Sequence, residues 1–323
     1  MILIDVSNKP DKDWNKRLIS SPTGTIYQTK ELAFYQQESI GISHHFIRFI
    51  NNKGNVIGQL LISIHPRFQT TNKLKNIFHK TPFSKKYTYR WVYGPVIFEP
   101  QYNEEIKNVL TKYLLQQKCR LLGSEHPRSE SIFSRLVSPF TITNWGTFII
   151  DLTLDEQELW NRLDQHSARK NVKRSKERNV CLREINESTI DDYYQLVKYT
   201  KAKAGVKLDF KDTKIALEKL SRVGFKIFVA YENDIPIGGT SFSFFNDYIN
   251  EWGIGRSERD QNAKLYSQDL LKWEIIKWGK KNECKYFDLT GVNPNPITEK
   301  EKGIFRYKKK WGGQFVNYGR IKI

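Results

Sequence analysis

Two sequence patterns occur twice in this chain, in the same order. The first is an apolar run that contains glycine, at residues 55–63 and again at residues 235–243. The second has a cysteine at its second position, continues through apolar residues and closes on a proline, at residues 118–127 and 283–294. Either pair alone is weak, but the shared order predicts a tandem α/β repeat. We expect the boundary between the halves at residues 140–146.

The length and composition agree with two domains. A chain of 323 residues, 39% of them hydrophobic, can bury a substantial core and is not disordered. We therefore predict an α/β protein of two tandem domains, each with a mixed sheet flanked by helices. The first domain is expected at residues 1–145 and the second at residues 146–313, with the tail 314–323 able to join the first.

The local patterns predict the main elements of each half. Strands are expected at residues 44–50, 56–64 and 91–97, followed by a helix at residues 104–117. In the second half, Thr153 or Asp155 could cap a helix at residues 155–163. The remaining expected elements are a strand at 147–152, a basic helix reaching about residue 178, strands at 225–231, 237–245 and 248–254, and a helix at 266–281.

The chain is strongly basic. It has 53 Lys and Arg against 35 Asp and Glu, a formal net charge of +18. This charge favours phosphate-bearing or polyanionic partners and anionic membrane surfaces, although it also serves solubility. Cations gather in residues 162–183, among them Arg169, Lys170, Lys173 and Arg174. These residues form either a nucleic-acid-binding surface or a solvated helix face.

The cysteines and the N-terminus bear on the compartment. Cys119, Cys181 and Cys284 are far apart, and the sequence has neither a Cys-x-x-Cys pair nor a Cys/His cluster with zinc spacing. We expect buried thiols in a reducing compartment and no metal site. The N-terminal segment lacks the apolar region of a signal peptide, and no apolar run reaches membrane-spanning length. A cytoplasmic protein is predicted, which could also rest on the inner face of a membrane.

The segment Gly303-Ile-Phe-Arg-Tyr-Lys-Lys-Lys-Trp-Gly-Gly313 has the most distinctive chemistry. Four of the five positions from 306 to 310 are cations, aromatic residues flank them, and two glycines follow. This combination suits an anionic group held against a closely approaching backbone. A solvated basic strand edge is the competing interpretation.

The order of these features resembles the FemABX family of peptidoglycan-bridge aminoacyltransferases, whose two domains each look like an N-acetyltransferase (GNAT) fold. The resemblance covers nearly the whole chain. Its most specific parts are residues 268–278, the segment Phe287-Asp-Leu-Thr-Gly291 and the C-terminal segment above. It implies amide formation between an amino acid carried by aminoacyl-tRNA and an amine of an anionic cell-wall precursor, without a cofactor. The first domain is then expected to be the acceptor side and the second the donor side.

The resemblance also implies site residues. Lys308 matches a family lysine associated with charge stabilisation, and its ammonium could stabilise an oxyanion or neutralise a donor phosphate. Residues 162–183 could contact tRNA phosphates or the acceptor's diphosphate. The other candidates in the second domain are Tyr307 to pack against the donor, Arg306 and Lys309 to bind phosphate, Gly312 to allow close approach, and Asp288 and Tyr266 as further cleft residues.

The first-domain motif departs from the family. Positions that can supply a lysine and an aspartate for the acceptor are occupied here by Gln36 and by Phe98, with Glu99 adjacent. The identity of the acceptor therefore stays open, with Gln36 and Glu99 as candidates. The sequence carries no signal for an oligomeric state.

Two other functions stay open. An acyl-CoA-dependent N-acyltransferase acting on an amino sugar or amino acid would need a glycine-containing turn for the pyrophosphate of CoA. Residues 256–264, at the corresponding position, contain no glycine, which weakens this alternative. The net charge of +18 also permits a non-catalytic nucleic-acid-binding protein.

Overall fold

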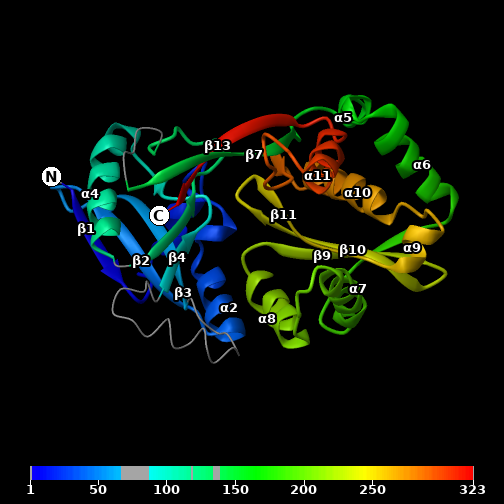
Figure 1. Cartoon of the computed structure of the whole chain (residues 1–323), viewed down its shortest axis with the longest axis horizontal. Coiled ribbons are helices and arrows are strands. Elements are labelled where there is room, and N and C mark those ends of the chain that lie inside the picture. Colours follow the sequence, from blue (N-terminus) through cyan, green and yellow to red (C-terminus); the bar gives the residue numbers. More distant parts are fainter. Residues whose placement is uncertain (1, 67–86, 118, 134–138, 323) are drawn as a thin grey trace. The chain divides into compact units, whose positions relative to one another are not determined.

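The computed structural model describes residues 2–66, 87–117, 119–133 and 139–322 (Figure 1). The chain forms two compact units, Met1–Trp145 with Asn317–Ile323, and Gly146–Val316. Each unit has strands in one mixed sheet with helices packed beside it. The predicted fold class, two tandem α/β units with mixed sheets flanked by helices, is therefore confirmed.

Unit 1 contains the first half of the chain and most of its last strand. Neighbouring strands in its sheet run β1 (Leu3–Ser7), β2 (Ser43–Ile50), β3 (Val56–Pro66), β4 (Tyr87–Trp91), β6 (Arg120–Ser124) and β13 (Gln314–Lys322). The short strand β5 (Val96–Ile97) pairs with β3. The α-helices described in this unit are α1 (Trp14–Ile19), α2 (Lys30–Ile40) and α4 (Asn103–Gln116). Strand β13 joins this sheet through antiparallel pairing with β6.

In unit 2, neighbouring strands run β7 (Thr141–Asp151), β12 (Tyr286–Asp288), β11 (Tyr248–Arg256), β10 (Ile235–Phe245), β9 (Phe225–Glu232) and β8 (Cys181–Glu184). Helices α7 (Ile190–Lys203) and α8 (Phe210–Leu220) cover one face, and α10 (Ser267–Lys281) covers the other (Figure 1). Beside α10 lie α6 (Lys170–Glu177) and α11 (Glu299–Lys309). The shorter helices are α5 (Glu156–Arg162) and α9 (Glu258–Asn262).

The same kind of crossover connection occurs in both units. In unit 1, α4 connects β4 to its parallel neighbour β6, and in unit 2, α10 connects β11 to its parallel neighbour β12. Parallel neighbours require such a crossover because a tight turn can join only antiparallel strands. The repeated sequence segments lie on corresponding elements, since residues 55–63 and 235–243 fall on β3 and β10. The predicted repetition is therefore present in the fold.

Among the helices of unit 2, α5 and α11 begin with side-chain caps, and only the cap of α5 was predicted. Asp155 accepts a hydrogen bond from the backbone N–H of Glu158 at 2.7 Å, which confirms one of the two predicted caps of α5. Thr298 and Glu301 form a capping box at the start of α11. The C-terminal basic segment is therefore helical as far as Lys309 and is not a strand edge.

Two predictions about individual segments were wrong. The single strand expected at residues 91–97 is interrupted, because Tyr93 has a left-handed φ of 53° and a cis Gly94–Pro95 bond follows. The expectation of three buried thiols fails at Cys181, which is exposed on β8, whereas Cys119 and Cys284 are buried. None of the helices in the described ranges combines the length and the apolar character that crossing a bilayer requires.

Candidate functional site

Lys308 lies in the last turn of α11, and its side chain is held by the turn after β12. Its Nζ donates hydrogen bonds to the carbonyl oxygens of Thr290 at 2.8 Å and Gly291 at 3.2 Å. Burial lowers the pKa of Lys308 to about 8, against the opposing effect of the Asp288 charge. An ammonium has three N–H donors. Within the described part of the chain two of them are used, so the third can serve a ligand.

Asp288 shapes the turn that presents these carbonyls. Its carboxylate is fully buried and accepts a hydrogen bond from the backbone N–H of Thr290 at 2.7 Å. Side chains that also donate to it are Thr147, Tyr248 and Asn250. Thr290 itself has a left-handed φ of 56°. The structure thus places Asp288 beneath the turn, where it orients the carbonyl oxygens that hold Lys308.

Two aromatic residues of this region carry buried donors. Within the described ranges, Oη of Tyr307 and Nε1 of Trp311 are buried and have no hydrogen-bond partner. Nζ of Lys310 lies 4.5 Å from the ring centroid of Tyr307 and 5.4 Å from that of Trp311. Burial, and the charge of Asp269, raise the pKa of Tyr307, so its hydroxyl stays protonated. Buried donors without acceptors are rare in folded proteins and suit a ligand with oxygen acceptors.

Asp269 of α10 contacts both α11 and α6. Its Oδ1 forms an ion pair with Lys310, which caps the end of α11, and its Oδ2 accepts a hydrogen bond from Nδ2 of Asn171 of α6 at 2.8 Å. The Lys310 and Asp269 side chains are only 12% and 8% exposed. This arrangement connects the C-terminal segment to the basic helix α6 through α10.

A second ion pair, between Lys272 and Glu251, is buried even more deeply. The two side chains are 2% and 4% exposed. Burial and the positive charges of Lys308 and Lys310 lower the pKa of Lys272. Sequence reasoning missed Lys272, Glu251, Asp269 and Lys310. The available signal was that Asp269 and Lys272, three residues apart in α10, flank the apolar residues Leu270 and Leu271, because charged residues are rarely buried without a partner.

The N-terminus of α10 is occupied by the chain's own carboxylate. Oδ1 of Asp260, which is fully buried, accepts a hydrogen bond from the backbone N–H of Ser267 at 2.9 Å. Tyr266, the residue before Ser267, has a left-handed conformation with φ 59°. The backbone N–H of Asp269 donates a hydrogen bond to the carbonyl oxygen of Tyr266. Helix N-termini bind anions through the backbone N–H groups of the first turn, which have no partner within the helix. Here an internal anion already fills that position.

The predicted basic surface lies on α6 and the π-helical turn before it, Gln165–Arg169. Lys170, Lys173 and Arg174 are exposed, whereas Arg169 is half-buried, and its buried Nε has no partner among the described residues. Arg174 donates to Oη of Tyr266 at 3.4 Å. Tyr266 and α6 are therefore brought together, and Asn171 extends the connection to Asp269 and Lys310.

The other candidates in the C-terminal segment are two exposed cations and one closely packed glycine. Arg306 and Lys309 are exposed on α11. Gly312 has φ +72°, and a Cβ there would lie 2.5 Å from the carbonyl oxygen of Arg162. The glycine is therefore required by packing against the chain itself.

In unit 1, Gln36 and Glu99 occupy separate hydrogen-bonded positions. Oε1 of Gln36 contacts Nε2 of His44 at 2.8 Å and accepts a hydrogen bond from Ser63 at 2.7 Å. Glu99 accepts a hydrogen bond from Gln101 at 2.8 Å. Among the described residues, no hydrogen bond joins Gln36 to Glu99, so the structure does not assemble them into one site.

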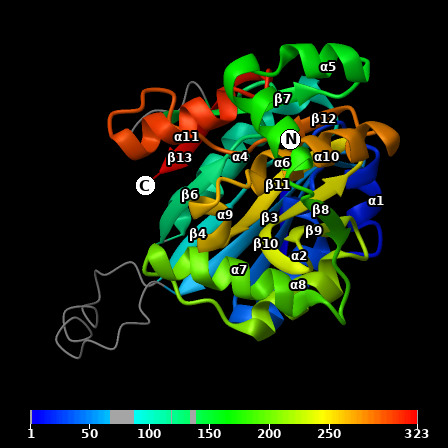
Figure 2. The ribbon, with the colours of Figure 1, turned by 90° about the vertical axis from the view of Figure 1, so that its right-hand side faces the viewer.

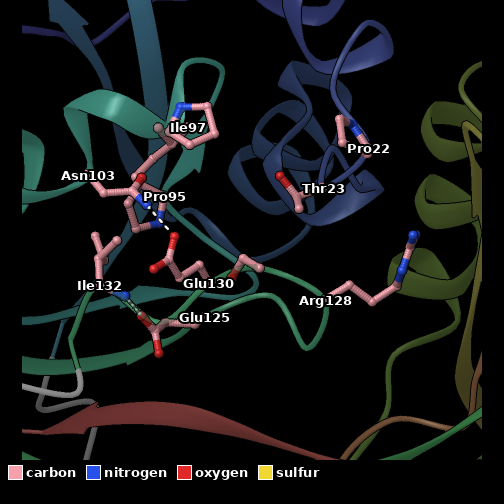
Figure 3. A pocket seen from close by; sticks show the side chains of 11 residues that line it. Pro22, Thr23, Pro95, Ile97, Asn103, Glu125, Arg128, Glu130 and Ile132 are labelled. Carbon is pink, nitrogen blue, oxygen red and sulfur yellow. Dashed lines mark hydrogen bonds between the residues drawn. The ribbon is translucent and has the colours of Figure 1, made fainter.

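Unit 1 also contains a cavity of about 190 Å³ that sequence reasoning did not predict (Figure 3). Pro95 and Ile97 form part of its wall, next to Glu99 in sequence. The carboxylate of Glu125 is held there by the backbone N–H groups of Ile132 at 2.8 Å and Phe133 at 3.1 Å. In the described part of the chain, no group of three or more His, Cys, Asp or Glu side chains could hold a metal ion.

The fold has counterparts among solved structures. FemX matches with a TM-score of 0.72 and 12% identity, over 98% of this chain and 96% of that one. The C-terminal domain of a putative lysylphosphatidylglycerol synthetase from Agrobacterium fabrum matches with a TM-score of 0.56 and 11% identity, over 86% and 83%. A tandem GNAT protein from the clavulanic acid biosynthesis pathway matches with a TM-score of 0.51 and 11% identity, over 100% and 98%.

These likenesses show the fold, which is the FemX fold with tandem GNAT-like units. Neither a protein-family model nor a curated protein matches the sequence.

Proposed function

We propose that this protein is an acyltransferase of the FemX and GNAT type, with Lys308 as its charge-stabilising residue. The finer proposal is that it transfers an amino acid from aminoacyl-tRNA to an amine of an anionic cell-wall precursor. The observation that carries it is the Lys308 ammonium, half-buried in a FemX fold with one donor left for a ligand.

The chemistry needs little from the protein beyond position and charge. The acceptor amine attacks the ester carbonyl of the donor, so a C–N bond forms and the C–O bond to the tRNA ribose breaks. The proton lost by the amine ends on the ribose hydroxyl that leaves. An ammonium near the carbonyl oxygen stabilises the negative charge that develops there, and such donors are worth about 10²-fold or more in rate. Lys308, with the buried donors of Tyr307 and Trp311 on the same segment, has the chemistry for this role.

Two features support a tRNA-borne donor over acyl-CoA. The N-terminus of α10, where a GNAT protein would bind the pyrophosphate of CoA, is filled by Asp260. The exposed cations Lys170, Lys173 and Arg174 lie on α6, which is linked to Lys310 through Asn171 and Asp269. A polyanionic donor would gain from this charge, whereas acyl-CoA would compete with a buried carboxylate.

The test is a transfer assay with purified full-length protein, aminoacyl-tRNA and a lipid-linked or nucleotide-linked cell-wall precursor that carries a free amine. Amide formation, followed by mass spectrometry, is the expected result. Lys308→Ala should lower the single-turnover rate about 10²-fold or more. Lys300→Ala, which removes an exposed charge from the first turn of the same helix, is the matched control and should leave the rate unchanged.

Three results would count against the proposal. Unchanged turnover in Lys308→Ala would remove Lys308 from the mechanism. Amide formation from acyl-CoA but not from aminoacyl-tRNA would favour a CoA-dependent N-acyltransferase. Steeply salt-dependent tRNA binding with no transfer to any amine would favour a non-catalytic nucleic-acid-binding protein.

A further inference from the structure

The connection between α7 and α8 in unit 2 exposes an unusual run of residues. All seven residues from 201 to 207, Lys-Ala-Lys-Ala-Gly-Val-Lys, are exposed. Val206 is 49% exposed and Phe210, at the start of α8, is 38% exposed. Gly205 has φ +71° and allows the chain to turn between the two helices. The connection therefore places apolar side chains at the surface between lysines.

The charge around this connection is predominantly positive. Six lysines stand in residues 198–214, against Asp209 and Asp212, which leaves a net charge of 6 − 2 = +4. All six lysines are exposed: Lys198, Lys201, Lys203, Lys207, Lys211 and Lys214. Asp209 is engaged as the cap of α8, where it accepts a hydrogen bond from the backbone N–H of Lys211 at 2.9 Å. The surface is thus a lysine cluster with apolar residues at its centre.

A hollow of about 820 Å³ lies within the cluster. Tyr194, Val206 and Leu208 contribute apolar surface to it, and its charged lining residues are Lys198, Lys207, Asp209 and Asp212. The ring of Phe210 packs edge-on against Tyr194 with centroids 5.0 Å apart, and Nζ of Lys198 lies 5.4 Å from the Tyr194 centroid. The lining thus combines apolar side chains with two lysines and two aspartates, so the excess positive charge of the surface comes from the other lysines of residues 198–214.

We propose that this α7–α8 surface docks the protein onto a bilayer that contains anionic phospholipids. Clusters of about four to eight basic residues attract anionic headgroups. Exposed Val206 and Phe210 can enter the interface while the lysine stems lie along it and keep their ammonium groups among the headgroups. A nucleic-acid surface would not need the exposed Val206, and the cluster contains no arginine. Charge and apolar exposure together therefore favour the membrane.

The position of the surface within unit 2 suits this role. Helices α7 and α8 pack against each other and cover one face of the sheet, whereas α10 covers the other (Figures 1 and 2). Docking through the α7–α8 connection would leave α10, and Lys310 paired with it, uncovered. This inference adds a membrane interaction to the proposed transfer reaction and does not depend on it.

The experiment measures co-sedimentation of the full-length protein with vesicles. One set is pure phosphatidylcholine and the other contains phosphatidylglycerol as well. We expect binding to the anionic vesicles alone, and weaker binding as salt rises. The triple variant Lys203→Gln/Val206→Ser/Lys207→Gln should bind anionic vesicles about 30-fold more weakly or worse, because it removes two lysines that contribute about 1 kcal/mol each.

The matched control is Lys12→Gln/Lys16→Gln/Ile19→Ser in unit 1, which also removes two exposed lysines and one exposed apolar residue. It should bind like the wild type. The proposal is overturned if the wild-type protein does not sediment with anionic vesicles, or if both variants lose affinity equally. It is also overturned if the α7–α8 variant loses tRNA binding while vesicle binding is unchanged, since the surface would then serve nucleic acid. Circular dichroism melts of both variants establish that they are folded.

Discussion

The carboxylate of Asp260 accepts a hydrogen bond from the backbone N–H of Ser267 at 2.9 Å, at the first residue of α10. A buried internal anion thus takes the position where a helix N-terminus would bind phosphate. We expect titration calorimetry to detect no saturable binding of CoA or acetyl-CoA, with a CoA-dependent GNAT enzyme as the positive control. Saturable binding that Asp260→Asn strengthens would show that the site accepts phosphate after all.

Lys308 should impose a descending limb on the pH dependence of transfer. Its pKa is lowered to about 8 by burial, so the ammonium that stabilises an oxyanion is deprotonated as pH rises through 8. The single-turnover rate should fall about tenfold per pH unit above that value, after correction for titration of the acceptor amine. Lys308→Arg keeps its charge at all these pH values and should lack the descending limb, although its rate at neutral pH is lower. A limb shared by both proteins would assign the titration to another group.

Gly312 and Gly303 provide a matched pair of substitutions. Gly312→Ala should lower the free energy of unfolding by about 1–3 kcal/mol, because φ is +72° and the new Cβ would meet the Arg162 carbonyl. Gly303→Ala, inside α11 with nothing within 4 Å of the new Cβ, should raise it by about 0.5–1 kcal/mol. Urea denaturation measures both. Equal effects of the two substitutions would contradict the assigned packing at Gly312.

Single and double variants of Lys272 and Glu251 should differ in their free energy of unfolding in the way expected of a buried ion pair. Lys272→Met leaves the Glu251 carboxylate buried without its partner and should lower the free energy of unfolding by about 3–5 kcal/mol. The double variant Glu251→Gln/Lys272→Met removes both charges and should be destabilised much less. The single variant Glu251→Gln completes the comparison. If the loss in free energy of unfolding of the double variant equals the sum of the losses of the two single variants, the two side chains do not act as a pair.

The basic helix α6 should contribute to the salt dependence of tRNA binding. Lys170→Gln/Lys173→Gln should reduce the slope of log K against log salt by about 0.7–0.9 for each phosphate that is no longer neutralised. The control Lys53→Gln/Lys112→Gln removes two exposed lysines from unit 1 and should leave the slope unchanged. The slope is measured by fluorescence anisotropy with labelled tRNA at several salt concentrations. Identical slopes in both variants would assign α6 to a solvated face.

Much of the local structure could be predicted from the sequence. Hydrophobic periodicity predicted the strands β2, β3, β9, β10 and β11 and the helices α4 and α10. This periodicity reflects the burial of one face of an element, and it can be recognised from residues that are close together in the sequence. The strand expected at residues 91–97 was wrong because a left-handed Tyr93 and a cis proline interrupt it, and a run of apolar residues does not reveal either. Cys181 was expected to be buried, but it lies on the edge strand β8.

The candidate site was predictable only as a set of residue types. The motif at residues 303–313 drew attention to Lys308, whose role stays a prediction, but its partners at Thr290 and Gly291 lie 18 and 17 residues away in the chain. Lys310 and Lys309 look equivalent in sequence, yet Lys310 is paired with Asp269 and Lys309 is exposed. Such differences depend on which face of α11 meets α10.

By itself, the sequence determined that this protein is a basic α/β protein of two repeated units, because composition and hydrophobic periodicity are properties of nearby residues. Only the tertiary structure decided that Asp260 accepts a hydrogen bond at the N-terminus of α10, that burial lowers the pKa of Lys308 to about 8 and that Lys272 is paired with Glu251. Burial and charge pairing arise when distant segments pack together and exclude water, and no local pattern specifies which segments will meet.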